Sequence, residues 1–238
     1  NNAGTSFLDV IYHTLQVPLQ GLSGSVGFAF IIPLTVHLLW WFGIHGATTV
    51  NGIVDPIMRA NLSDNAQLFR DGRLSVAEGA HIIAKNTDRM YQLGGSGNTV
   101  GLVVFLLIFA KSQQLKTLGP LTVGGTIFNI NEPVIFGAPI VMNPLLFIPF
   151  VFVPTLTYLA LYFLISTGIV SPATGVEIPW TTPPIIHGFL AGGWTWAVFE
   201  FFALVFSVVA YFPFMRKYDQ QLLAEEQGAS PEEAIEAL

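Results

Sequence analysis

The chain has 238 residues, of which 52% are hydrophobic and only 10% are charged, whereas a soluble domain carries roughly 25% charged residues. This shortage of charge excludes a soluble enzyme, because charged side chains keep a folded surface in water. The formal net charge of −6 comes without a basic stripe that would neutralise phosphates, which excludes nucleic acid as a partner. The lack of cysteine excludes disulfides, thiolate metal sites and a cysteine nucleophile.

The chain begins with Asn1-Asn2-Ala3-Gly4, without the basic stretch and following apolar run of a signal peptide. We expect it to be part of a longer protein. Residues 5–22 are apolar and contain Pro18, so they are expected to lie along a membrane interface or to end an earlier helix. Residues 26–43 are the first predicted span, because they are apolar and uncharged and a membrane helix needs about 20 such residues.

Residues 55–89 differ from the apolar sequence around them. They hold five acidic and five basic residues, with Asp71-Gly72-Arg73 as a turn signal. This balance predicts a solvated or interfacial segment and leaves its side of the membrane open. The second predicted span covers residues 98–110, with an extension to residue 115. Lys111 and Lys116 lie at its end, and the positive-inside bias places them on the cytoplasmic side.

Residues 119–144 and 179–193 are apolar but repeatedly interrupted by glycine and proline. Such segments are predicted to be re-entrant, which a membrane tolerates only where protein or a water-filled cavity covers the backbone. Residues 145–169 and 194–214 are the remaining predicted spans. The pattern predicts an all-α, polytopic integral membrane protein with re-entrant, broken helical hairpins. Two broken segments also indicate a transport site, because unwound backbone supplies polar groups at membrane depth.

The charge pattern divides the chain into two predicted parts. Residues 1–218 are expected to form the membrane-embedded transport domain, and residues 219–238 an acidic tail with six acidic residues and no basic one. Arg216 and Lys217 follow the last span, so the positive-inside bias places the C-terminus in the cytoplasm. Ser230-Pro231-Glu232-Glu233 is a helix-start signal, so the tail is expected to be a short helix or a disordered stub.

Glu132 is the leading candidate for chemistry, because it is the sole charge between Lys116 and Glu177. A carboxylate at membrane depth is costly and is a functional candidate by default. Pro133 favours a helix start at this point, and exposed N–H groups at such a start stabilise an anion. Glu132 would then accept hydrogen bonds from sugar hydroxyls. The alternative is that it only caps the helix.

Other candidates are an imidazole, two indoles, an amide and a second acid. His45 lies between glycines, and a neutral imidazole both donates and accepts, which matches a hydroxyl. A structural histidine is the alternative. Trp40 and Trp180 suit the apolar faces of sugar rings, with interfacial anchoring as the alternative for each. Asn98 offers an amide in a glycine-rich turn. Glu200 is an intramembrane acid that could pair with a neighbouring helix or carry a proton.

Three motifs together resemble a known family. They are Gly43-Ile44-His45-Gly46, the run Asn129-Ile130-Asn131-Glu132-Pro133-Val134-Ile135-Phe136-Gly137-Ala138-Pro139, and Pro179-Trp180-Thr181-Thr182-Pro183-Pro184. This set resembles the membrane-embedded IIC component of the bacterial phosphotransferase system, in its lactose/cellobiose/diacetylchitobiose branch. The resemblance covers essentially all of the chain and corresponds to the C-terminal, substrate-binding half. We expect the N-terminal half, which resembles the dimer-forming part in the family, to lie outside this chain.

The resemblance implies a sugar permease subunit in the bacterial cytoplasmic (inner) membrane. It would bind a β-linked disaccharide at mid-membrane and carry it inward by an elevator-like movement. A cytoplasmic IIB partner, phosphorylated on its own cysteine, would then phosphorylate the sugar 6-hydroxyl, so no catalytic phosphoryl donor, cofactor or metal is expected in this chain. His45 and Glu132 would lie near that hydroxyl. The substrate-binding residues that the resemblance implies are His45, Glu132, Trp40, Trp180, Asn98 and Asn131.

Two other function classes stay open on the sequence. The first is a proton-coupled sugar symporter, which would use Glu200 or Glu132 as the proton carrier. It is distinguished by whether uptake needs a proton gradient or a phosphorylated partner. The second is a receptor or scaffold that does not transport, which would show no saturable sugar binding. The sequence does not indicate which disaccharide binds.

Overall fold

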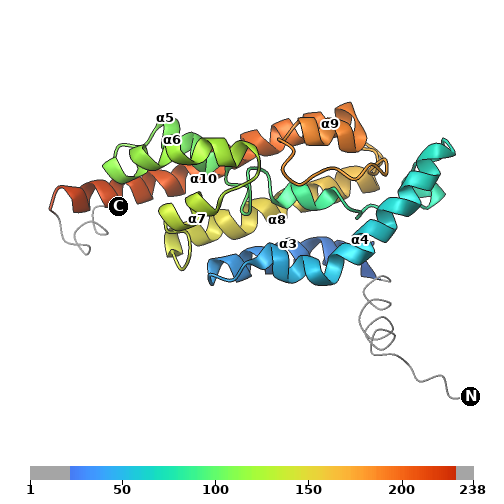
Figure 1. Ribbon diagram of the computed structural model, residues 1–238, viewed down its shortest axis with the longest axis horizontal. Coiled ribbons are helices and arrows are strands. Elements are labelled where there is room, and N and C mark those ends of the chain that lie inside the picture. The colour runs from blue at the N-terminus through green and yellow to red at the C-terminus, as the bar shows by residue number, and fades with distance from the viewer. Residues whose placement is uncertain (1–21, 229–238) are drawn as a thin grey trace, which may run out of the picture.

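The computed structural model describes residues 22–228, and this part of the chain is helical and contains no β-strand (Figure 1). This confirms the predicted all-α class. In chain order the elements are α3 (Val26–Trp41), α4 (Gly46–Arg70), η2 (Val76–Glu78), η3 (Thr87–Tyr91), α5 (Val100–Ile108), α6 (Gln113–Ile127), α7 (Glu132–Gly137), α8 (Pro144–Ser166), α9 (Ile186–Gly192) and α10 (Trp194–Glu226).

Helices α8 and α10 form the centre of an elongated bundle and run in opposite directions (Figure 1). Among the described residues, these two helices are long and apolar enough to cross a membrane. They confirm the spans predicted over 145–169 and 194–214, although α10 continues to Glu226. Helix α3 packs against α8 on one side, and α5 and α9 pack against α10 on the other.

Helix α3, with 16 residues and an N-cap at Ser25, lies where the first span was predicted over residues 26–43. It is shorter than the two helices that are long enough to cross a membrane, so the span itself stays a prediction. The chain then turns directly into α4. The turn requires glycine at position 46, because a Cβ there would lie 1.9 Å from the carbonyl oxygen of Val36. This close approach fixes the first turns of α4 beside the end of α3, and both elements contribute to the pocket described below.

The second predicted span, over residues 98–110, is wrong. Helix α5 has only nine residues, and a rise of about 1.5 Å per residue cannot cross a hydrocarbon core of roughly 30 Å. The chain reverses after Ile108, and α6 packs back against α5. Asp219 of α10 stabilises the reversal, because its carboxylate accepts the backbone N–H groups of Lys111 and Ser112 at 2.8–3.0 Å.

The two segments predicted to be broken are interrupted in the structure. Residues 119–144 contain the end of α6, a loop and the six-residue α7. Residues 179–193 contain irregular backbone followed by α9. Helix α10 passes the predicted boundary between residues 218 and 219 without a break, so the predicted tail begins inside a helix. The helix-start signal at Ser230 and the interior Pro18 lie outside the described residues.

Candidate functional site

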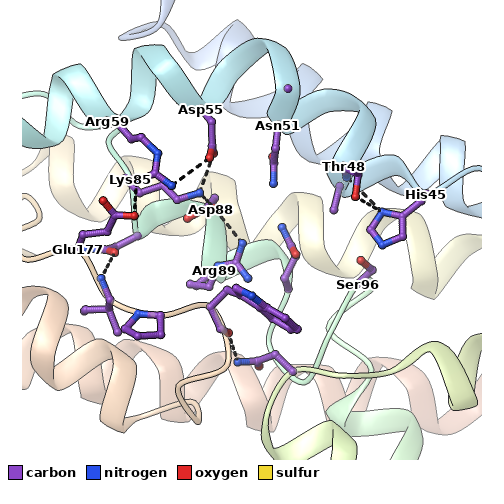
Figure 2. Close-up of a pocket in the computed structure, with 18 of the residues that line it drawn as sticks. His45, Thr48, Asn51, Asp55, Arg59, Lys85, Asp88, Arg89, Ser96 and Glu177 are labelled. Carbon is purple, nitrogen blue, oxygen red and sulfur yellow. Dashed lines mark hydrogen bonds and ion pairs between the residues drawn. The ribbon is translucent and has the colours of Figure 1, made fainter.

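A cavity of about 940 Å³ opens between five chain segments, one of which is the end of α3 at Trp40. The other four are the first half of α4, the stretch from Lys85 to Ser96 that includes η3, the α6–α7 loop with the start of α7, and the irregular segment 177–180. Figure 2 shows His45, Thr48 and Ser96 toward one end of the cavity and a group of charged side chains toward the other. These segments are far apart in the sequence, and the helical bundle brings them together.

His45 and Glu132 face each other at the first end. His45 is the N-cap of α4, and its Nδ1 atom accepts the backbone N–H of Thr48 at 3.2 Å. Because a backbone N–H can only donate, Nδ1 is unprotonated and the neutral ring carries its proton on Nε2. That Nε2 atom lies 4.0 Å from Oε1 of Glu132, with both side chains about half exposed. The cavity end therefore offers one donor beside one anionic acceptor.

Glu132 is the first residue of α7, as the following Pro133 predicted. Within residues 22–228 its carboxylate accepts no hydrogen bond, and Nε2 of His45 lies 4.0 Å away. Its side chain is 47% exposed. The carboxylate therefore lines the cavity without a hydrogen-bond partner from the described residues, which makes it available to a polar ligand.

Two indoles line the cavity. Trp40 is buried, and its ring centroid lies 4.3 Å from that of His45. Its Nε1–H has no hydrogen-bond partner within residues 22–228. Trp180 is 53% exposed, so a large part of its ring is free for contact. Stacking surface and hydrogen-bonding groups thus occur together.

Asn131 lines the cavity, but its amide is already bonded to the protein. It accepts the N–H of Ser96 at 3.1 Å and donates to the Ser96 carbonyl at 2.6 Å and the Thr99 hydroxyl at 2.7 Å. The close fit requires Gly95, because a Cβ there would lie 2.2 Å from the Asn131 side chain. Asn98 is fully buried behind the cavity wall, where it bonds Leu93 and Met90.

A network of ion pairs occupies the opposite end (Figure 2). Lys85 donates to Asp55 at 2.7 Å and to Asp88 at 2.8 Å, and Arg89 donates to Asp88 at 2.8 Å. Arg59 pairs with Glu177 and, at 3.4 Å, with Asp55. The prediction that residues 55–89 are solvated or interfacial is thus wrong at its end, because Asp88 and Arg89 are buried. Three chain segments neutralise one another there, which balanced charges in one sequence stretch do not reveal.

Asp88 is held in its charged form. It lies in η3, outside the two candidate spans. Burial alone would raise the pKa of this carboxyl, but the positive charges of Arg89 and Lys85 hold the pKa below its ordinary value. Its Oδ1 atom has no hydrogen-bond partner within residues 22–228, and neither has Nε2 of the neighbouring Gln92. The charged end therefore also has unused polar atoms.

Glu200 lies away from the cavity, and its carboxylate is fully buried. It accepts Nδ1–H of His187 at 2.7 Å and the backbone N–H groups of Gly188, at 3.0 Å, and Ile185. Glu200 thus pins α9 and its preceding loop to α10. Within residues 22–228, no group of three or more His, Asp or Glu side chains is placed to hold a metal ion.

The family of this chain follows from its similarity to known proteins. Residues 2–154 match the family described as "Phosphotransferase system, EIIC". The chain belongs to this EIIC family. Members of the family are membrane proteins, so the predicted polytopic membrane class and the predicted family are confirmed.

Similar EIIC proteins are known over most of this chain. It is 38% identical over 236 residues to the oligo-beta-mannoside-specific EIIC component of Bacillus subtilis (strain 168), covering 96% of this chain and 52% of that protein. It is 36% identical to the lactose-specific EIICB component of Lacticaseibacillus casei, covering 98% of this chain and 40% of that protein. The crystal structure of ChbC, the IIC component of the N,N'-diacetylchitobiose-specific phosphotransferase system, matches with a TM-score of 0.86 and 40% identity, over 94% of this chain and 52% of ChbC.

The chain therefore spans about half the length of these relatives. Of the six binding residues predicted from the sequence, five line the cavity and Asn98 does not. Their contact with sugar stays a prediction. Sequence reasoning missed the charged end and the two asparagines Asn86 and Asn129, which also line the cavity. Asn129 could have been predicted as a site residue, because it is a polar residue in an irregular and otherwise apolar stretch.

Proposed function

We propose that this chain is the sugar-binding part of an EIIC permease. It binds a β-linked disaccharide such as cellobiose, lactose or diacetylchitobiose in the cavity and carries it inward, where a phosphorylated IIB protein phosphorylates it. One observation carries the proposal. The donor Nε2–H of His45 and the carboxylate of Glu132 lie 4.0 Å apart in one open cavity, whose lining also includes the exposed Trp180.

The chemistry of the cavity suits a disaccharide. A sugar ring has an apolar C–H face that stacks on an indole, and hydroxyls that need both donors and acceptors. The cavity volume of about 940 Å³ lies within the range of roughly 300–1,000 Å³ for small-molecule sites. The first end offers one donor and one acceptor, and the exposed indole of Trp180 in the lining offers a surface for stacking. The second end offers further polar atoms, Oδ1 of Asp88 and Nε2 of Gln92, which have no hydrogen-bond partner within residues 22–228.

The relatives support the substrate class and the partner. Their names specify an oligo-beta-mannoside, lactose and diacetylchitobiose. The lactose relative is an EIICB component, which supports a IIB partner for this chain. With the phosphoryl donor on that partner, the chain supplies binding and orientation: Glu132 accepts from a sugar hydroxyl, and His45 contacts the hydroxyl that receives the phosphoryl group.

We further propose that the C-terminus faces the cytoplasm, with residues 1–218 as the membrane domain and 219–238 as its tail. Asp219 bonds the backbone of Lys111, which supports one membrane side for Lys111, Lys116, Arg216 and Lys217, as the positive-inside bias requires. A homodimer through the N-terminal half of the longer protein, in the bacterial cytoplasmic membrane, completes the proposal.

The test is sugar binding by the full-length purified protein that contains this chain. Cellobiose, lactose and diacetylchitobiose are titrated in a calorimeter, with sucrose as a disaccharide without the β-linked pyranose pair. Saturable binding of at least one of the three, followed by formation of its 6-phosphate when phosphorylated IIB is added, is expected. Absence of saturable binding for all three would support a receptor or scaffold for another ligand.

A proton-coupled symporter receives less support. The sequence offered Glu200 or Glu132 as its proton carrier, and three donors from His187, Gly188 and Ile185 already occupy the Glu200 carboxylate. A proton carrier must be reached by solvent in each cycle, whereas Glu200 is fully buried. Membership of the phosphotransferase family also supports phosphoryl transfer as the driving force.

A further inference from the structure

Residues 177–180 line the cavity and belong to a stretch of irregular backbone, residues 176–182, which we call the strap. It contains no helix or strand. Within it, the N–H of Thr182 donates to the carbonyl of Pro179 at 3.0 Å, which forms a turn around Trp180. Irregular backbone satisfies few of its own polar groups, so in a membrane protein other groups must bond the rest. The strap carries Glu177 and Trp180 into the cavity lining.

Asn129 holds one end of the strap. Its Nδ2 amide donates to the carbonyls of Trp180 and Thr182, both at 2.9 Å. Its Oδ1 atom accepts the N–H of Gly94 at 2.8 Å. One side chain thus ties the α6–α7 loop to the glycine-rich loop and to the strap. Asn129 has φ +64°, a left-handed conformation that asparagine tolerates better than most residues.

Asn86 holds the other end in the same manner. Its Nδ2 amide donates to the Val176 carbonyl at 2.7 Å, and its Oδ1 atom accepts the N–H of Ile178 at 3.3 Å. Its φ is +82°, also left-handed, and its side chain is buried. Two asparagines from separate loops therefore satisfy four backbone groups of the strap, on either side of the residues that enter the cavity.

We infer that Asn86 and Asn129 are positioning residues for the sugar site. They fix the strap from both ends and so set the place of Trp180 against the sugar ring. The inference rests on the proposed function, because it assigns the strap a role in sugar binding. The amides themselves are occupied by backbone bonds, so their effect on the sugar is exerted through Trp180. Glu177, paired with Arg59, gives the strap a third attachment on the charged side.

The main test variant is Asn129→Asp in the full-length protein. Aspartate keeps the size of the side chain and can accept the N–H of Gly94, but its ionised carboxylate cannot donate to the two strap carbonyls. We expect the affinity for whichever of cellobiose, lactose and diacetylchitobiose binds the wild type to fall by roughly tenfold, which corresponds to about 1.4 kcal/mol. Asn86→Asp loses one such bond instead of two and should show a smaller loss in the same direction.

Asn65→Asp is the matched control. Asn65 is also buried and clamps backbone, since it donates to the His81 carbonyl at 3.0 Å and accepts the His81 N–H at 2.7 Å. It lies outside the cavity lining. Its substitution should lower the thermal unfolding midpoint without changing sugar affinity. If Asn129→Asp does not give folded protein, Asn86→Asp carries the same comparison.

A double-mutant cycle separates positioning from a general structural role. On a Trp180→Ala background, Asn129→Asp should change affinity by less than twofold, because the residue through which it acts is gone. A full tenfold loss on that background, or wild-type affinity in folded Asn129→Asp and Asn86→Asp proteins, would overturn the inference. A wild type that binds none of the three sugars would instead overturn the proposed function.

The strap can also be followed without sugar. This chain has no cysteine, so Thr181→Cys introduces one thiol into this part of the protein, beside Trp180, and the full-length protein without the substitution gives the background labelling. We expect a maleimide to label this thiol faster when Asn129→Asp is added, and at an unchanged rate when Asn65→Asp is added. Equal labelling rates in all three proteins would show that the asparagines do not hold the strap, whatever the ligand of the cavity is.

Discussion

Nε2 of His45 lies 4.0 Å from Oε1 of Glu132, although the two residues belong to different helices, 87 positions apart. Each sits at a helix start, His45 as the N-cap of α4 and Glu132 as the first residue of α7. Helix starts present unpaired N–H groups, and here the two starts converge on one cavity. A sugar hydroxyl placed between them would accept from the imidazole and donate to the carboxylate.

Glu132→Gln should weaken sugar binding by roughly tenfold or more. The variant keeps the shape of the side chain but loses a charge-assisted hydrogen bond worth about 1.5–3 kcal/mol. Calorimetric titration of the full-length protein measures the change. Glu225→Gln, an exposed acid near the end of α10, is the control and should bind as the wild type. Unchanged affinity in Glu132→Gln would leave Glu132 with only a role at the helix start.

His45 requires two substitutions, because it has two roles. His45→Ala removes the N-cap of α4, at a cost of about 0.5–2 kcal/mol in stability, together with the Nε2–H donor. His45→Asn keeps a good N-cap residue but cannot reach the position of Nε2. We expect both variants to bind sugar and support its phosphorylation poorly, with the thermal midpoint lowered only in His45→Ala. Normal binding and phosphorylation in His45→Asn would reduce His45 to a helix cap.

Asp88→Asn should destabilise the protein strongly. Removing this carboxylate leaves Arg89 buried without its partner, and such a change costs about 3–5 kcal/mol. Asp55→Asn is the comparison, because the Asp55 side chain is 26% exposed and its loss should cost about 1 kcal/mol or less. The thermal unfolding midpoints of the purified variants measure the difference. Equal midpoints for the two variants would mean that the charged end is more hydrated than its burial indicates.

Glu200→Gln should lower stability without creating or removing a proton requirement. A glutamine amide would place N–H groups against the N–H donors that Glu200 now accepts. In the fraction that folds, sugar uptake should persist when the proton gradient is collapsed and the phosphate-donor chain is intact. Uptake that stops with the gradient, yet continues without the cytoplasmic phosphate donor, would favour the symporter.

The sequence determined the class of the protein and one end of its cavity. Hydropathy is read along the chain, so the apolar runs that form α3, α8 and α10 were predictable, as was the interruption around Pro133. The helix start at Glu132 followed from the same proline. These features depend on neighbouring residues, and local sequence is sufficient to specify them.

Only the tertiary structure decided where the polar residues between those runs go. Arg59 and Glu177 are 118 positions apart, and Asn129 reaches Trp180 across 51 positions. A single sequence holds no record of such pairings. Residues 55–89 looked solvated because their charges balance, yet Asp88 is buried since Lys85 and Arg89 neutralise it there. Burial of a charge depends on its partners in space, and those partners are set by how the helices pack.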